Sequence, residues 1–211
     1  MKKKISKAII LSILFFFFII PLLAQERPDA LELFKQGRYE EAVSVCKQEL
    51  KETPKRKDAI VVISWSLVAL GRYQEALDYS ERGLNIDPSD HRIIANAGEA
   101  LYYLGRYDEA LIRFQDYIKI APTGERIAIV YYYMGEIFIN RGEFVNADIA
   151  LSTALYHYPG MVEWWVRLGY ARERAGGNKE ALEAYEQALM LDNNHQDALR
   201  GRDRVRLKLT E

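Results

Sequence analysis

Apolar residues recur every three or four positions on both sides of Gly105, which is the spacing that buries one face of an α-helix. Before this glycine they include Ala97 and Leu101, and after it they include Ala110 and Phe114. Glycine can adopt the left-handed conformation that ends a helix, and the acidic residues that follow suit the first turn of a second helix. The pattern therefore predicts a helical hairpin that turns at Gly105.

The same hairpin pattern returns along most of the chain. The phrase Gly-Arg-Tyr-x-Glu-Ala begins at Gly37, Gly71 and Gly105, which are 34 residues apart. Weaker versions follow at Gly142 and Gly176, after steps of 37 and 34 residues. A period of this length is typical of repeat proteins whose hairpins stack side by side. We expect an all-α solenoid of helical hairpins, in which one connection is lengthened by the three additional residues.

Small residues occupy the positions where the two helices of a hairpin would come closest, because close approach leaves no room for larger side chains. They recur seven residues before each turn glycine and five residues after it, and in three hairpins also twelve residues after it, where Glu49 and Tyr117 are the departures. A proline seventeen residues after each of the first four turn glycines ends the second helix. The small residues are Ser64, Gly98, Gly135 and Gly169, then Ala42, Ala76, Ala110, Ala147 and Ala181, then Gly83, Ala154 and Ala188; the prolines are Pro54, Pro88, Pro122 and Pro159.

On these residues the chain resembles the tetratricopeptide repeat family, whose 34-residue hairpins stack into a right-handed superhelix. The last repeat departs most from the family pattern, because Asn178 replaces the aromatic residue and Asn193 replaces the proline. Residues 196–211 predict a helix that caps the end of the array, with binding of anionic lipid by its basic side chains as the alternative. The resemblance implies an array over residues 25–195, with a partial repeat at about 26–56 and full repeats at about 57–90, 91–127, 128–161 and 162–195.

The first 24 residues form a separate segment, in which a lysine-rich start precedes an apolar run over residues 8–23. This is the layout of a secretory signal, and cleavage after Ala24 would change the formal net charge from −1 to about −5 by removing four lysines. An uncleaved membrane anchor over residues 5–23 is the alternative, because the run is near the lower length limit for a spanning helix. We expect an exported protein, in the periplasm or on the periplasmic face of the inner membrane.

The inventory of reactive side chains is small. Cys46 is the only cysteine, so no internal disulfide can form, and its place in a predicted helix favours a core role over a reactive thiol. His91, His157 and His195 have no partner at metal-ligand spacing, and the chain has no phosphate-binding glycine loop. The charge balance gives no basic field for nucleic acid. We therefore expect no catalysis, cofactor or metal; an enzyme with a site spread across repeats is the least favoured alternative.

The resemblance also implies a binding groove, because the first helices of successive tetratricopeptide hairpins line a concave surface. Tyrosine is abundant at the groove positions and suits protein interfaces, since it combines an apolar ring with a polar end. Packing within or between repeats is the alternative for each of these rings. The candidate groove residues are Val61, Trp65, Arg92, Asn96, Glu99, Tyr102, Tyr103, Tyr132, Tyr133, Glu136, Asn140, Arg167, Tyr170 and Arg174.

The groove does not resemble the one that grips the acidic tails of cytosolic chaperones. Asn96 occupies one of the required positions, but Val61, Trp65, Ile129 and Tyr133 stand at the others. We expect a non-enzymatic scaffold of the cell envelope that binds a protein or peptide segment of unspecified identity. A membrane-tethered assembly factor and a ligand-binding accessory of a transport system are the alternatives, and association into a homo-oligomer through an apolar terminal face stays open.

Overall fold

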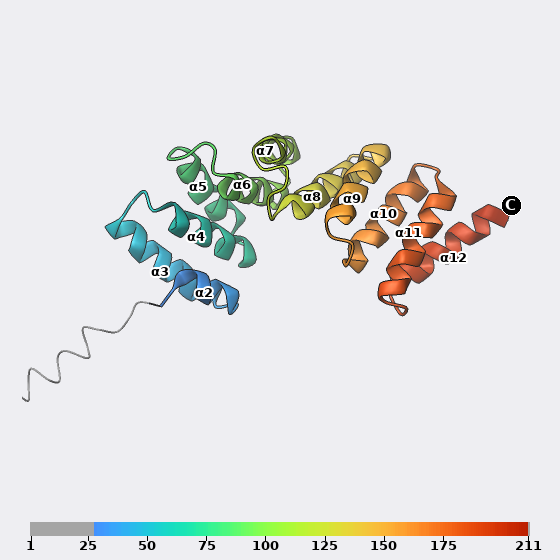
Figure 1. Cartoon of the computed structure of the whole chain (residues 1–211), viewed down its shortest axis with the longest axis horizontal. Coiled ribbons are helices and arrows are strands. Elements are labelled where there is room, and N and C mark those ends of the chain that lie inside the picture. Colours follow the sequence, from blue (N-terminus) through green and yellow to red (C-terminus); the bar gives the residue numbers. More distant parts are fainter. Residues whose placement is uncertain (1–27, 211) are drawn as a thin grey trace, which may run out of the picture.

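The protein forms an extended array of helices that follow one another in antiparallel pairs (Figure 1). The computed structural model describes residues 28–210, and this part of the chain contains eleven α-helices and no strand. Its first and last helices lie at opposite ends of the array (Figure 1). The prediction of an all-α solenoid of hairpins is confirmed. The predicted signal or anchor segment and its cleavage position lie outside the described residues.

In the described part of the chain, five hairpins are followed by a single terminal helix that packs on the last hairpin. The first helices of the hairpins are α2 (Ala30–Lys35), α4 (Lys57–Ala69), α6 (His91–Tyr103), α8 (Ile127–Asn140) and α10 (Val162–Arg174). The second helices are α3 (Tyr39–Glu52), α5 (Tyr73–Leu84), α7 (Tyr107–Ile120), α9 (Phe144–His157) and α11 (Asn178–Leu191). The terminal helix is α12 (Gln196–Thr210), and within residues 28–210 no helix is both long and apolar enough to cross a membrane.

The glycine of every hairpin turn has the left-handed backbone conformation that the sequence predicts. The φ angles lie between 72° and 90° at Gly37, Gly71, Gly105, Gly142 and Gly176. At Gly105 the chain reverses so tightly that the Arg106 amide donates to the Leu101 carbonyl at 2.9 Å. A side chain with a Cβ would be strained at this φ, so glycine fixes the position of each turn.

The small residues before each turn lie where the two helices touch, as predicted. A Cβ added to Gly98 would stand 2.5 Å from the Phe114 ring, and one added to Gly169 would stand 2.7 Å from the Tyr185 ring. In the first hairpin Cys46 holds the place that Phe114 and Tyr185 hold in theirs, nine residues after the turn glycine. It is fully buried, and burial raises the pKa of its thiol to about 12, which confirms the expected core role.

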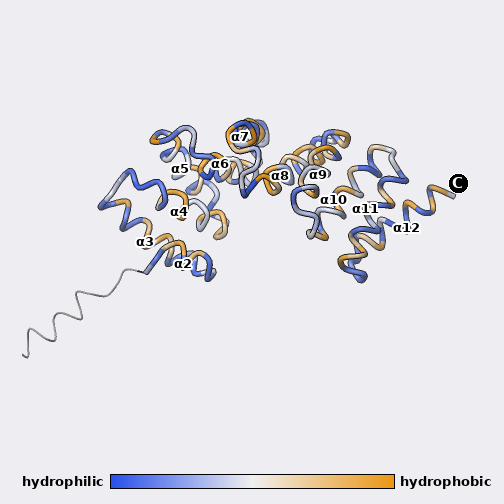
Figure 2. Tube along the Cα trace, viewed as in Figure 1, coloured by the Kyte–Doolittle hydropathy of each residue, from blue (hydrophilic) through white to orange (hydrophobic). Residues whose placement is uncertain are grey.

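Hydrophobic and hydrophilic positions are interspersed along the helices (Figure 2), and many of the hydrophobic side chains are buried. One cluster of buried residues runs from α2 to α9, and two smaller clusters continue it to α12. The packing is thinnest between α7 and α8, where the lengthened connection over residues 121–126 lies. The Tyr117 hydroxyl holds this connection by accepting a hydrogen bond from the Arg126 amide at 3.1 Å.

Candidate partner-binding groove

An open pocket of about 540 Å³ lies on the side of the array formed by the first helices of the first three hairpins. Aromatic rings form its walls: Phe34 and Trp65 contact each other at 5.6 Å between ring centroids, and Tyr73 stacks on Tyr103 at 4.6 Å. Tyr103 is 44% exposed, so part of its ring is available to a partner. The pocket lining consists of Phe34, Trp65, Val68, Ala69, Tyr73, Glu99, Tyr103 and Arg126.

The charged part of this pocket is an ion pair between Glu99 of α6 and Arg126 of the lengthened connection. The Arg126 guanidinium also donates to the Asn96 side-chain oxygen at 2.6 Å, and the Tyr133 hydroxyl donates to Glu99 at 2.6 Å. Burial, with Glu99 as the next cause, raises the pKa of Tyr133 far above its usual range, so the hydroxyl stays protonated as a donor. Arg126 therefore ties α6 to the connection that leads into α8.

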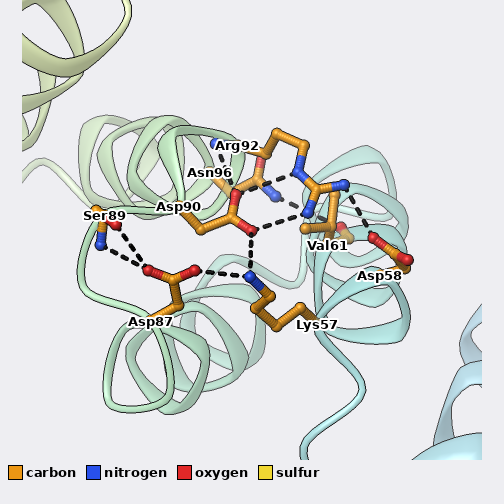
Figure 3. A network of polar contacts seen from close by, with 8 residues as sticks. All are labelled: Lys57, Asp58, Val61, Asp87, Ser89, Asp90, Arg92 and Asn96. Atoms are coloured by element: carbon orange, nitrogen blue, oxygen red, sulfur yellow. Dashed lines mark hydrogen bonds and ion pairs between the residues drawn. The ribbon is translucent and has the colours of Figure 1, made fainter.

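A polar network fixes the junction between α4, α6 and the connection that precedes α6 (Figure 3). Arg92 binds Asp90 at 2.8 Å and Asp58 at 2.9 Å, and Lys57 binds Asp87 at 2.6 Å. Hydrogen bonds from Lys57 and then from Ser89 lower the pKa of Asp87 to about 2. These carboxylates and cations satisfy one another across the junction, so Arg92 acts here as an inter-repeat contact.

The tyrosines of the middle hairpins pack mainly against each other. The Tyr102 ring lies 4.8 Å from that of Tyr133 and 5.1 Å from that of Tyr103, and burial raises the pKa of Tyr102 to about 12. Tyr132 stacks on Trp164 of α10 at 4.9 Å, and burial raises its pKa. Tyr102 and Tyr132 are half-buried and Tyr133 is buried, so Tyr103 presents the most open ring of the set.

At the C-terminal end of the groove, buried glutamates bind arginines of the next first helix or of α12. Glu136 accepts a hydrogen bond from Arg167 at 2.6 Å, and Glu173 accepts one from Arg204 at 2.6 Å and one from Lys208 at 2.8 Å. The bonds from Arg204 and Lys208 lower the pKa of Glu173 to about 2, although burial acts in the opposite direction. We name Glu99, Glu136 and Glu173, with their cationic partners, the glutamate ladder.

The remaining predicted groove residues lie beside this ladder. Arg174 is exposed, and its guanidinium lies over the Phe144 ring at 4.7 Å and donates to the Tyr170 hydroxyl at 2.8 Å. Tyr170 is half-buried, with the guanidinium of Arg167 over its ring at 5.5 Å. Asn140 is exposed at the end of α8, with its amide 3.5 Å from the Tyr107 hydroxyl.

The expectation that Val61, Asn96, Tyr133 and Glu136 face an open groove is corrected by their burial. Their relative exposures are 1%, 0%, 6% and 8%, because the neighbouring hairpins cover these positions and use their polar atoms. Asn96, for example, bonds both the Val61 carbonyl and Arg126. These four residues hold successive hairpins in place.

Several residues of the open pocket are absent from the set predicted from the sequence. Phe34 lies three residues before its turn glycine, as Tyr102 does, so aligning the short first hairpin with the third would have found it. Tyr73 lies two residues after its turn glycine, at a position that is aromatic in the first four hairpins, and it contacts the next hairpin. Arg126 lies in the lengthened connection, outside the periodic pattern, and no sequence signal pointed to it.

Within residues 28–210 no group of three or more His, Cys, Asp or Glu side chains is arranged to hold a metal ion. Three models of the tetratricopeptide repeat match the chain, at residues 29–91, 67–131 and 162–195. The chain is a tetratricopeptide repeat protein. Members of this family are protein-interaction scaffolds and are typically not enzymes. A comparison with curated protein sequences gives no match.

Solved structures share the fold of this tetratricopeptide repeat protein. MamA from Desulfovibrio magneticus RS-1 is 20% identical, with a TM-score of 0.68 over 79% of this chain and 93% of its own. YrrB, described as a TPR protein with an unusual peptide-binding site, is 20% identical, with a TM-score of 0.65 over 82% and 88%. TTC0263, a thermophilic TPR protein from Thermus thermophilus, is 22% identical, with a TM-score of 0.62 over 84% and 95%.

Proposed function

We propose that this protein is a non-enzymatic scaffold of the bacterial cell envelope that holds a segment of a partner protein in its groove. The observation that supports the proposal is the open aromatic pocket, because exposed Trp and Tyr faces beside a cavity are typical anchors for a partner's apolar side chain. The Glu99–Arg126 pair offers polar atoms to the partner's backbone at the same place. The envelope location rests on the lysine-rich start and the apolar run of the first 24 residues.

We place the partner's apolar side chain at the first three hairpins. The rings of Tyr102 and Tyr132 are largely occupied by other rings, whereas Trp65 and Tyr103 border open space. YrrB, which has the same fold, is described as having a peptide-binding site, in keeping with a peptide segment as the ligand. The pocket volume of about 540 Å³ suits one or two side chains of such a segment.

The test is a quantitative crosslinking pull-down of the full chain from its native envelope, comparing Tyr103→Ala with Tyr158→Ala. Tyr158 is also an exposed tyrosine, at 55%, but it lies outside the pocket. We expect Tyr103→Ala to reduce recovery of the principal partner about tenfold and Tyr158→Ala to leave it unchanged, with the helical circular dichroism of both variants preserved. Equal recovery with both variants would refute the pocket as the binding site.

Fractionation of the same cells into envelope and cytosol tests the location. A recovered chain that begins at Gln25 would agree with an exported and processed protein, and one that keeps its first residues in the membrane fraction would agree with the tethered form. Recovery of the intact chain from the cytosol would refute the envelope proposal.

A further inference from the structure

The outer face of α9 carries a row of exposed apolar side chains. Val145, Ile149 and Tyr156 are 66%, 63% and 84% exposed. Steps of four and seven residues place all three on one stripe of a helix, and the half-buried Ser152 completes that stripe between Ile149 and Tyr156. We name these four residues the α9 stripe. It lies on a second helix, whereas the aromatic pocket is bounded mainly by first helices, so it is a separate surface.

The other second helices show that the fold does not require this stripe to be apolar. Counted from the turn glycine, the same four positions carry at least two charged residues on every other second helix, whereas the α9 stripe carries none. The counterparts are Glu40, Ser44, Lys47 and Lys51 on α3; Gln74, Asp78, Glu81 and Asn85 on α5; Asp108, Ile112, Gln115 and Lys119 on α7; and Lys179, Glu183, Glu186 and Met190 on α11.

The polar neighbours of the α9 stripe are occupied within the chain. Asp148 pairs with Arg172 at 2.9 Å, and Asn146 donates to Glu143 at 2.8 Å. The whole of α9 contains no lysine or arginine, so it lacks the cationic flanks that hold an amphipathic helix on an anionic membrane surface. The Ser152 hydroxyl donates to Asp148 at 2.9 Å and accepts from Arg172 at 3.3 Å, so this charged pair is satisfied beside the stripe. The exposed side chains of Val145, Ile149 and Tyr156 carry no charge themselves and fit an equally uncharged protein surface.

We propose that the α9 stripe is a self-association surface, on which α9 of a second copy packs antiparallel about a two-fold axis. The order of side chains is self-complementary in size: an axis between positions 150 and 151 sets Ile149 against Ser152 of the second copy and Val145 against Tyr156 of the second copy. Each contact then joins a larger side chain to a smaller one, and a two-fold axis makes each contact twice. Serine near the axis lets the two helices approach closely.

The same pairing would fail on two of the other second helices. On α5 it would set Asp78 against Glu81 of the second copy, and on α11 it would set Glu183 against Glu186 of the second copy. Like charges that face each other across an interface oppose association. The α9 stripe has no such conflict, so its charges do not oppose a second copy of the chain, and the match of larger to smaller side chains favours that copy as the occupant.

The first experiment measures the dimer dissociation constant of the full chain by sedimentation, with all variants in the same buffer and detergent. Ile149→Lys is compared with Ile112→Lys, because Ile112 holds the equivalent place on α7 and is similarly exposed, at 56%. We expect the wild-type chain to dimerise, Ile149→Lys to raise the dissociation constant at least about tenfold, and Ile112→Lys to leave it unchanged. A monomeric wild-type chain, or equal dissociation constants for the two variants, would overturn the proposal.

The second experiment tests the orientation of the two copies with a short bis-maleimide crosslinker. In the antiparallel pair the two copies of residue 152 are offset along the axis by about 5 Å and those of residue 145 by about 16 Å. Ser152→Cys should therefore crosslink far more than Val145→Cys, and more than Gln115→Cys at the equivalent place on α7. The native Cys46 is buried and should not react. Crosslinking of Val145→Cys as strong as that of Ser152→Cys would overturn the antiparallel arrangement.

Discussion

The two ends of the groove share the same hairpin backbone but differ in their side chains, which are mainly aromatic at one end and mainly charged at the other. At the N-terminal end, Trp65 lies against Phe34, Tyr103 stacks on Tyr73, and these rings border an open pocket. At the C-terminal end, a hollow of about 430 Å³ is lined by arginines, and Arg167 and Arg204 are bound to the buried carboxylates of the glutamate ladder. The first end keeps apolar surface free for a partner, whereas the second end uses its charges to fasten successive helices.

The largest expected effect on stability comes from the close helix–helix contacts that both ends of the groove share. Gly98→Val and Gly169→Val each place a branched side chain where a ring already lies, at 2.5 Å and 2.7 Å from the added Cβ. We expect each to lower the free energy of unfolding by about 3 kcal/mol, measured by urea denaturation. Gly160→Ala is the control, because its Cβ would meet no atom within 4 Å. If only one of the two valine variants were destabilised, the two ends would not share a common frame.

The second prediction distinguishes the two ends by the pH dependence of the free energy of unfolding. Glu173 has a pKa lowered to about 2, so its bonds to Arg204 and Lys208 stabilise the folded protein above the ordinary glutamate range and are lost as pH falls toward 2. We expect Glu173→Gln to cost on the order of 2 kcal/mol at pH 7, and the difference from wild type to vanish between about pH 4.5 and pH 2. Urea denaturation across this pH range measures it.

Glu186→Gln is the matched control for Glu173→Gln, because Glu186 also binds an α12 arginine, Arg206, but from an exposed position on α11. Its unfolding midpoint should stay close to that of wild type at every pH. A penalty for Glu173→Gln that persisted unchanged at pH 2 would show that the side chain acts through packing and not through its charge.

The parts of the molecule that the sequence predicts well are those that repeat. The left-handed turn at Gly105 depends on glycine and the close contact at Gly98 depends on a small residue, so the same or a similar residue returns in each hairpin and becomes visible as a period. Groove exposure follows a different rule. Whether Asn96 is open or buried depends on how the next hairpin is positioned relative to α6. It also depends on which long side chain of the following segment reaches Asn96.

The position of Arg126 could not be predicted from the repeat period. It lies in the lengthened connection, yet it supplies the cation for Glu99 and the donor for Asn96, and it lines the aromatic pocket. A residue outside the repeat has no equivalent in the other hairpins from which its position could be inferred. The three-residue surplus was visible in the sequence, but the direction of its side chains was not.

The smallest expected effect on stability concerns the arginine and glutamate of the repeated Gly-Arg-Tyr-x-Glu-Ala motif. In the first three hairpins the arginine after the turn glycine binds the glutamate three residues later, as Arg106 binds Glu109 at 2.7 Å, whereas the last two hairpins have Glu143 and Gly177 at the arginine position. Both members of the Arg106 pair are largely exposed to solvent, where water and salt screen the attraction. We therefore expect Arg106→Ala to leave the thermal unfolding midpoint unchanged, at low salt and at high salt. A clear loss of stability at low salt would mean that these pairs help to fasten the N-terminal hairpins as Glu136 and Glu173 of the glutamate ladder fasten the C-terminal ones.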